Sequence, residues 1–287
     1  MKSAPSRQLA LSVAALSGFL ATFAANPAGA QEAGKEPRPA AEEKPAGDAG
    51  GENANDADGA IPPALTEYRG RTIAQTMHWL GAEWLLRQER EREEATTVMI
   101  EQLKLAPGMT VCDMGSGNGY HSLMMAKAVG PEGKVVAVDI QEEMLKLLQA
   151  RARAANVENI ETILSVPHDA KLPPDAFDLI LLVDVYHEFS HPEQMLQGMR
   201  RALKPDGVIA LVEFRLEDES VPIKLLHKMS KEQILKEYVP MGFKLVRSFD
   251  ELPWQHLMFF GKDAAPAPEA PAAPAPPAPP AKHEGDE

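Results

Sequence analysis

The strongest constraint on the fold is a glycine-rich segment, Val111-Cys112-Asp113-Met114-Gly115-Ser116-Gly117-Asn118-Gly119-Tyr120. An apolar strand that ends in Asp-x-Gly-x-Gly-x-Gly and then opens a helix brings bare backbone against a ligand, because side chains at the glycines would block close approach. In an open α/β sheet such a ligand lies beyond the carboxyl end of the strand. The segment therefore predicts an α/β fold with a ligand site at this edge.

Strand and helix patterns alternate after this segment. Apolar strand patterns cover residues 110–114, 134–139, 159–164, 177–185 and 208–214, and helical patterns cover 120–129, 142–155 and 192–203. Such alternation predicts a mostly parallel sheet with helices on both faces. Ser230 and Gln233 then mark a helix start, and 243–249 and 255–260 follow as an antiparallel pair. The patterns predict seven strands, the last of them antiparallel.

The first thirty residues have the pattern of an export signal. Lys2 and Arg7 precede an apolar run over residues 9–25, and Ala28-Gly29-Ala30 offers a small-residue cleavage site. We expect cleavage after Ala30, so that residues 1–30 are a signal peptide and the mature chain is periplasmic or secreted. The alternative is an uncleaved N-terminal segment that anchors the chain to the membrane.

Two segments of biased composition flank one domain. Residues 31–67 are rich in Ala, Glu, Gly and Pro, and residues 262–287 are mostly Ala and Pro, so both are predicted to be disordered. The domain over 68–261 contains 28 acidic and 22 basic residues. This balance makes nucleic acid an unlikely partner and favours small molecules or proteins. The single cysteine, Cys112, excludes an intrachain disulfide.

The ligand pattern differs from that of a dinucleotide. In a Gly-x-Gly-x-x-Gly loop the third glycine would fall at Tyr120, whereas here it falls at Gly119. Asp113 precedes the loop, where its carboxylate suits a cationic amine better than a pyrophosphate. Asp139 ends the next strand, 20 residues beyond Gly119, where a carboxylate accepts the hydroxyls of a ribose.

Three segments occur in a familiar order and spacing: Val111–Tyr120, Val135-Val136-Ala137-Val138-Asp139-Ile140 and Leu203-Lys204-Pro205-Asp206-Gly207-Val208. Over residues 95–261 the chain resembles the class I S-adenosylmethionine-dependent methyltransferases, which have a Rossmann-like sheet. The resemblance implies S-adenosyl-L-methionine as cofactor, and it implies these cofactor-binding residues: Asp113, Gly115, Ser116, Gly117, Gly119, Asp139, Ile140, Asp169, Ala170 and Asp184. By the same resemblance, Lys204–Gly207 is a turn, with a positive φ expected at Gly207.

Methyl transfer needs in-line placement of an acceptor, and a general base for some acceptors only. Residues that follow the fourth and fifth strands are the candidates for contacting the acceptor. We expect Tyr186, His187 and Glu188 to form the catalytic group, with Glu213 and Arg215 as further candidates.

One motif points to a different chemistry. His187-Glu188-Phe189-Ser190-His191 matches the His-Glu-x-x-His of zinc proteases, which requires both histidines on one helical face. Pro192 disfavours helical geometry at His191, and a buried strand precedes His187. The sequence therefore predicts no metal site of this type.

A segment ahead of the glycine-rich strand is a candidate lid. Ile73, Met77, Leu80 and Trp84 repeat at helical spacing, which predicts an amphipathic helix over 72–94 within a helical lid over 68–105. Extra segments in this position often cover the cofactor in the resembled family. Candidate substrate or lid residues are Met77, His78, Trp84, Trp254 and His256, with His227 weighed beside them.

The leading hypothesis is an exported methyltransferase that acts on a small molecule or a protein. The export signal creates a difficulty, because S-adenosylmethionine is made in the cytoplasm. The second hypothesis is therefore a catalytically silent module that binds S-adenosylmethionine, S-adenosylhomocysteine or a nucleoside. A nicotinamide-dependent oxidoreductase is the weaker third, since Tyr120 replaces the glycine that it needs. The sequence leaves the oligomeric state open.

Overall fold

The computed structural model describes residues 61–263. The signal peptide predicted over 1–30 lies outside these residues, as do most of the predicted linker over 31–67 and nearly all of the predicted tail over 262–287. Among the helices of the described part, none has the length and apolar character needed to cross a bilayer.

The main sheet has the predicted topology. Its seven principal strands are β3 (Thr110–Met114), β4 (Lys134–Asp139), β5 (Ile160–Leu164), β6 (Phe177–Val183), β7 (Leu203–Arg215), β9 (Phe243–Phe249) and β10 (Gln255–Lys262). They lie in the order β5-β4-β3-β6-β7-β10-β9, and β10 runs antiparallel to both of its neighbours. The two-residue strand β8 (Lys228–Met229) pairs in parallel with the end of β7. The prediction of a mostly parallel sheet with an antiparallel last strand is confirmed.

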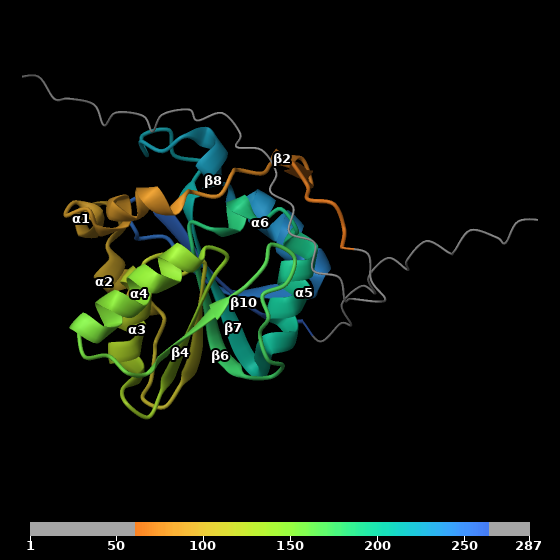
Figure 1. Cartoon of the computed structure of the whole chain (residues 1–287). Coiled ribbons are helices and arrows are strands. Elements are labelled where there is room, and N and C mark those ends of the chain that lie inside the picture. The colour runs from red at the N-terminus through yellow and green to blue at the C-terminus, as the bar shows by residue number, and fades with distance from the viewer. Residues whose placement is uncertain (1–60, 264–287) are drawn as a thin grey trace, which may run out of the picture. The chain divides into compact units, whose positions relative to one another are not determined.

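Helices cover both faces of this sheet, as Figure 1 shows, with α2, α3 and α4 on one side and α5 and α6 on the other. The helices are α1 (Arg90–Glu94), α2 (Thr96–Gln102), α3 (Tyr120–Val129), α4 (Glu142–Ala154), α5 (Pro192–Ala202) and α6 (Lys231–Tyr238), with the short 3₁₀ turns η1 (Trp79–Leu86), η2 (Tyr186–Glu188), η3 (Leu225–His227) and η4 (Val239–Met241). A separate hairpin joins β1 (Glu67–Tyr68) to β2 (Arg71–Thr72). The Ser230 hydroxyl caps α6 by accepting from the Gln233 amide, as predicted.

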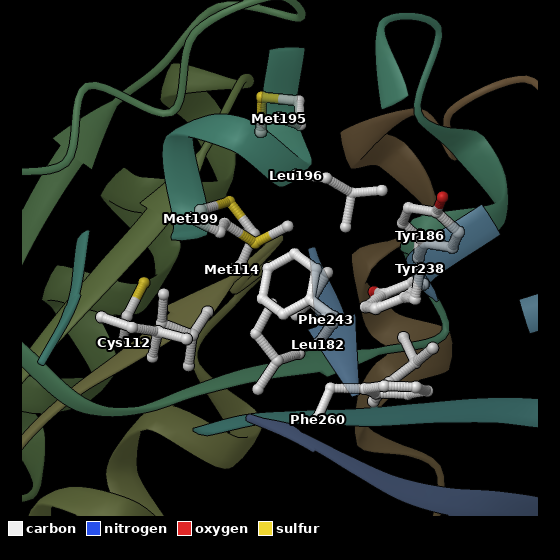
Figure 2. Close-up of a cluster of buried hydrophobic side chains, with 14 of the residues drawn as sticks. Cys112, Met114, Leu182, Tyr186, Met195, Leu196, Met199, Tyr238, Phe243 and Phe260 are labelled. Carbon is white, nitrogen blue, oxygen red and sulfur yellow. The ribbon is translucent and has the colours of Figure 1, made fainter. Parts of the chain in front are cut away.

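Two apolar clusters hold the layers together. One packs the α2 and α3 side of the sheet around buried side chains such as Met99 and Met125. The other lies between the sheet and α5 and α6, and Figure 2 shows Met199 of α5 with Phe243 and Phe260 of the last two strands among its members. These clusters fix the parallel strands so that their carboxyl ends form one rigid edge.

The chain order reverses at β3, which positions the site. From β3 the chain proceeds outward through β4 to β5, and it then returns to the other side of β3 through β6 and β7. The change of direction at β3 therefore places the candidate site at the carboxyl ends of the strands beside it, because ligands bind at such switch points in open α/β sheets.

The helix predicted over 72–94 is wrong. Residues 73–78 form no helix or strand, and only the 3₁₀ turn η1 and the short α1 follow. The backbone of this segment bonds elsewhere, because the Ala74 amide donates to the His187 carbonyl at 3.1 Å. Leu80 and Trp84, expected on a buried stripe, are 68% and 44% exposed. Tertiary hydrogen bonds therefore outweigh the helical spacing of the apolar residues.

The turn expected at Lys204–Gly207 is also corrected. These residues belong to β7, at a register shift opposite the start of β6, and φ at Gly207 is not in the left-handed region. A Cβ atom at Gly207 would lie 2.6 Å from the Phe177 carbonyl oxygen. Close approach of two backbones, and not a positive φ, is what requires glycine there.

Candidate active site

The loop after β3 has the strained backbone that its glycines allow. The φ angles of Gly115, Gly117 and Gly119 are 72°, 52° and 78°, a region that other residues rarely adopt. Space is limiting as well, because a Cβ at Gly115 would lie 2.4 Å from Val185 Cγ2, and one at Gly119 would lie 2.5 Å from Leu148 Cγ. The glycines thus pack the loop onto the segment between β6 and η2 and onto α4, while leaving its outer backbone bare.

Asp139 ties this loop to the end of β4. Its Oδ2 accepts the Gly117 amide at 2.8 Å, and its Oδ1 accepts the Gln141 amide at 2.9 Å. A carboxylate has about four acceptor positions, so two remain for the hydroxyls of a ribose. Burial raises the pKa of Asp139, although the backbone amides oppose that shift.

Asp113 lies directly before the glycine loop and is almost fully buried. Its Oδ2 accepts the Ser122 hydroxyl, and burial raises its pKa to about 6. A nearby cation would offset this cost of burial, which fits the amine contact expected from the sequence. The neighbouring Ser116 Oγ is buried and has no hydrogen-bond partner among the described residues.

Asp184 follows β6 in a left-handed conformation, with φ of 51°. Its Oδ2 accepts the Gln255 side-chain amide at 2.7 Å, while its buried Oδ1 has no partner within the described part of the chain. Burial holds the pKa of this carboxyl well above its ordinary value. A strained backbone and an unpaired acceptor at the end of a central strand keep Asp184 a candidate for contacting a ligand.

The remaining cofactor candidates lie in the loops beside β4 and β5. Ile140 is 39% exposed directly after Asp139, so its side chain is available for stacking. Asp169 is exposed, and its Oδ1 accepts the Lys171 amide. Ala170 is buried in the apolar cluster under α5 and can offer only its backbone to a ligand.

These features fit the cofactor that the resemblance implies. Three glycines remove side chains from one loop, Asp139 retains free acceptor positions, and buried Ser116 Oγ and Asp184 Oδ1 lack partners within residues 61–263. The ligand that satisfies such a donor and acceptor set carries hydroxyls and at least one cationic group. S-adenosylmethionine, with its ribose, amine and sulfonium, has this chemistry.

The segment between β2 and α1 lies across this edge. Gln141 is its main anchor, because its side chain accepts the Trp79 amide at 2.8 Å and donates to the Met77 carbonyl at 2.9 Å. At the glycine loop, the Asn118 side-chain amide donates to the Ala82 carbonyl at 2.8 Å. A Cβ at Gly117 would lie 2.9 Å from Leu85 Cδ1. The segment therefore contacts the loops after both β3 and β4.

Arg90 and Glu94 of α1 form a buried ion pair above the same loop. Arg90 Nε donates to Glu94 Oε2 at 2.7 Å, and the Arg90 guanidinium lies 4.4 Å from the centre of the Tyr120 ring. Both side chains are at most 5% exposed. A buried guanidinium beside the glycine loop is a candidate partner for a carboxylate of the ligand.

A cavity of about 270 Å³ lies beside η2. Its lining residues are Arg71, Thr72, His187, Leu216, Leu225, Leu226 and Lys228. The wall combines three leucines with two cationic side chains and one imidazole. A chain of contacts links it to the cofactor edge, since Met77 donates its amide to Glu188 Oε1 at 3.3 Å and accepts from Gln141 through its carbonyl.

His187 is held at the cavity wall by Glu213 of β7. Its Nδ1 lies 2.7 Å from Glu213 Oε2, and its backbone amide donates to Glu213 Oε1 at 3.2 Å. Its Nε2 lies 3.0 Å from His227 Nδ1. Burial by itself lowers the pKa of His187, but the adjacent Glu213 carboxylate outweighs it and the pKa is raised. Burial raises the pKa of Glu188 to about 7.

Tyr186 does not share this position, which corrects its assignment to the catalytic group. The side chain is 0% exposed and lies in the apolar cluster beside Tyr238, as Figure 2 shows. Its hydroxyl donates to Glu237 Oε2 at 2.8 Å, and Glu237 also pairs with Arg71. Tyr186 therefore supports the core behind the site and has no surface to offer an acceptor.

The two histidines of the His-Glu-x-x-His motif do not form the zinc-protease arrangement. His187 lies in η2, whereas His191 is the N-cap of α5, with φ of −131° and ψ of 60°. The His191 ring contacts the Ser190 hydroxyl and the Pro62 carbonyl, at 3.0 and 2.9 Å. The geometric argument made from Pro192 is confirmed.

The other candidate substrate residues are placed as follows. His78 caps η1 by accepting the Leu80 amide, and Trp84 stacks under the Arg87 guanidinium at 3.7 Å. Trp254 lies before β10, and its carbonyl accepts the Arg215 amide. His256 Nε2 lies 2.8 Å from Glu217 Oε2, so its ring is turned toward that carboxylate. Within the described residues, these four side chains do not contact one another and do not form one site.

Several site residues had no signal in the sequence. Arg71, Leu216, Leu225, Leu226 and Lys228 line the cavity but come from segments with no recognisable motif. Gln141 and Leu85 are equally ordinary in sequence. Their roles arise from contacts between distant segments, which local spacing does not encode.

Comparison with known proteins places the chain in a family. Residues 105–257 match a family model described as a methyltransferase domain. A demethylmenaquinone methyltransferase from Listeria welshimeri is 31% identical over 111 residues, which cover 39% of this chain and 47% of that protein. The ubiquinone/menaquinone biosynthesis C-methyltransferase UbiE from Pseudomonas entomophila is 28% identical over 153 residues, covering 53% and 58%. The chain thus spans about half the length of these curated relatives.

The fold also matches a solved structure. A SAM-dependent methyltransferase from Aquifex aeolicus superposes with a TM-score of 0.61 at 23% identity, covering 64% of this chain and 98% of that one. Its likeness concerns the fold alone, whereas the family match covers more than half of the chain. The chain belongs to the methyltransferase domain family and has the class I, Rossmann-like fold of the S-adenosylmethionine-dependent methyltransferases.

Proposed function

We propose that this protein is an S-adenosylmethionine-dependent methyltransferase that acts on a small molecule. The observation that carries the proposal is the carboxyl edge of the sheet, where a bare glycine loop faces Asp139 and the unpaired Asp184 Oδ1. Family membership supports the same activity. The bound cofactor would supply an activated methyl group, and the protein's part is to hold the acceptor in line with it.

The cavity beside His187 supports a small acceptor. Its volume of about 270 Å³ is close to the lower end for small-molecule pockets, and a folded protein segment would need a larger surface. Three leucines suit an apolar body, and Lys228 suits an acidic or strongly polar end, whereas the Arg71 guanidinium is already paired with Glu237. The relatives named for demethylmenaquinone and ubiquinone/menaquinone methylation agree with such a substrate class.

His187 and Glu188 are the residues that we assign to the acceptor. His187 lines the cavity, and Glu188 is joined through the Met77 backbone to Gln141 beside Asp139. They therefore stand between the acceptor cavity and the cofactor edge. Glu213 acts through His187, because it fixes both the ring and the backbone of that residue.

We further propose that the enzyme is exported and that residues 77–90 act as a lid over the cofactor. Export is supported by the basic, apolar and small-residue order within residues 1–30. The lid is supported by the contacts of Gln141 and Asn118 with this segment. Sequencing the N-terminus of the protein recovered outside the cytoplasm tests export, and a mature chain that starts at Gln31 is the expected result.

Calorimetry of the full chain with S-adenosylmethionine, S-adenosylhomocysteine and NAD tests the cofactor assignment. We expect both adenosyl ligands to bind at one site and NAD to give no heat. The control is Gly117→Arg, whose side chain fills the loop that the cofactor needs. Binding of NAD alone would point to an oxidoreductase and remove the proposal.

Turnover separates an enzyme from a silent binding module. The purified chain is incubated with S-adenosylmethionine and small hydrophobic acids, phenols and quinols, and S-adenosylhomocysteine is measured. Formation above the rate of Gly117→Arg supports a methyltransferase. Tight binding of both adenosyl ligands with no product from any acceptor would favour the silent module.

A further inference from the structure

Two adjacent side chains and a third that is distant in sequence converge beside the cavity. His187 and Glu188 come from η2, whereas His227 comes from η3, forty residues later. One ligating atom from each lies within 4.8 Å of the others. Two imidazoles and one carboxylate are a donor set that Zn²⁺ uses in catalytic sites, where a fourth position stays open.

The facing ring nitrogens are almost at ligand spacing. His187 Nε2 lies 3.0 Å from His227 Nδ1 and 4.0 Å from Glu188 Oε1. Two nitrogens bound tetrahedrally to one Zn²⁺ at about 2.05 Å would be about 3.3 Å apart. A few tenths of an ångström between the rings, and a small rotation of the Glu188 carboxylate, would therefore turn the contact into a metal site.

Glu213 gives His187 the support that metal-bound histidines usually have. Its Oε2 lies 2.7 Å from His187 Nδ1, so that nitrogen carries the proton and Nε2 presents its lone pair to His227 and Glu188. Glu213 is 0% exposed, and its other oxygen holds the His187 backbone amide. A carboxylate behind the ring fixes the tautomer and the orientation of the ligand.

We propose that His187, Glu188 and His227 bind a divalent transition metal ion, with Zn²⁺ as the first candidate, and that its open position faces the cavity. His187 lines that cavity, as do Leu225 and Leu226, which precede His227. Metal binding stands on this geometry alone, whereas the ion's contact with an acceptor atom rests on the proposed function. The site is distinct from the His187–His191 pair of the sequence motif, because His191 turns to Ser190 and Pro62.

The test uses the untagged full chain after treatment with a chelator. Zn²⁺ is titrated against a chromophoric chelator, and Co²⁺ is added separately because tetrahedral Co²⁺ absorbs visible light strongly. We expect one ion per chain. His227→Ala should reduce the affinity by more than 10²-fold, and Glu213→Gln by about 10- to 100-fold, the range for loss of a supporting carboxylate.

The matched control is His191→Ala, which removes the second histidine of the motif but none of the proposed ligands. We expect its Zn²⁺ affinity to be unchanged. Circular dichroism of His227→Ala confirms that the variant is folded, since His227 is only half-buried. No saturable binding by the parent chain, equal affinity in His227→Ala, or loss in His191→Ala alone would overturn the site.

The same preparation is titrated with S-adenosylmethionine, which separates this proposal from the proposed function. Zn²⁺ binding without cofactor binding would leave the metal site standing and remove the methyltransferase. Cofactor binding without Zn²⁺ binding would do the reverse.

Discussion

The buried carboxyl of Asp113 makes the free energy of unfolding depend on pH. Its pKa is raised from 3.8 to about 6 by burial, so the folded protein holds this proton more tightly than the unfolded chain does. Between these values the folded state binds more protons, and the free energy of unfolding therefore falls as pH rises through the window. At about 1.4 kcal/mol per pKa unit, the loss is on the order of 3 kcal/mol.

Asp113→Asn should remove this dependence. The amide oxygen can still accept from Ser122, but the buried charge that forms above pH 6 is absent. We expect the unfolding free energy of the variant, relative to the parent, to increase between pH 4 and pH 7. Urea unfolding at several pH values measures it, and parallel pH profiles for the two proteins would contradict the role given to Asp113.

Asp139→Ala should weaken S-adenosylmethionine binding by one to two decades. The carboxylate is expected to hold the ribose through bonds of roughly 1.5–3 kcal/mol, and it also anchors the Gly117 and Gln141 amides. Calorimetry measures the affinity, and Asp139→Asn, which keeps one acceptor oxygen, should lose less. Unchanged affinity in Asp139→Ala would mean that the ribose is held elsewhere.

The residues that the sequence identified are those with a local signature. Asp113, Gly119 and Asp139 are recognisable because strand ends and loop glycines recur at fixed spacing, and the structure places all three at the carboxyl ends of β3 and β4 or in the loop between β3 and α3. Tyr186 and His187 are neighbours in sequence, yet one lies in the core and the other at the cavity. The direction in which each of these two side chains points depends on packing against η3, α6 and the β1–β2 hairpin. The spacing of residues in the sequence does not encode such contacts.

At the scale of elements, the strands of the sheet and the helices that cover it were predictable, because each is an unbroken run of residues with an apolar or amphipathic pattern. The structure of the segment before α1 was not predictable, because its backbone hydrogen-bonds to His187 of η2 and to Gln141 instead of forming the hydrogen bonds of a helix. The prediction of a positive φ at Gly207 was wrong for a related reason. The backbone of Phe177 on the neighbouring strand, and not a turn at Gly207 itself, leaves no room for a side chain there.

Gly115→Ala tests whether the loop glycines serve packing as well as ligand access. The added Cβ would strain a φ of 72° and meet Val185 Cγ2 at 2.4 Å. Overpacking of this kind costs about 1–3 kcal/mol, in addition to about 1–2 kcal/mol for the left-handed backbone. Urea unfolding should show a larger loss of unfolding free energy in Gly115→Ala than in the control Gly108→Ala. At Gly108 φ is 85°, but no atom lies within 4 Å of the added Cβ.

Gln141→Ala tests the lid. Loss of its two bonds to residues 77 and 79 should free the segment, so amide hydrogens over 77–86 should exchange faster and the cofactor should dissociate faster. Hydrogen exchange with mass spectrometry measures the first effect. Gln149→Ala is the control in α4, the helix that Gln141 precedes, because the Gln149 side chain bonds only Thr162 among the described residues. Equal exchange in the two variants would show that Gln141 does not hold the segment.

At the scale of the whole molecule, cofactor binding should raise thermal stability. A ligand at 100 times its Kd adds about 2.7 kcal/mol to the unfolding free energy. For a domain of this size that corresponds to a rise in Tm of roughly 5–10 °C. S-adenosylhomocysteine should produce the shift in the parent chain and not in Gly117→Arg. A comparable shift with NAD would speak against the cofactor assigned here.

The place of β10 in the sheet bears on when the chain can fold. β10 comes last in the described fold, yet it separates β7 from β9, and β9 has no other strand partner within that part of the chain. The ribosome must therefore add 47 residues after β7 before the sheet can close, which takes roughly 2 to 10 s at ordinary rates of synthesis. During that interval the nascent chain has an open edge and an incomplete core. If the proposed export takes place, a channel that accepts only unfolded chains has this interval in which to engage the chain.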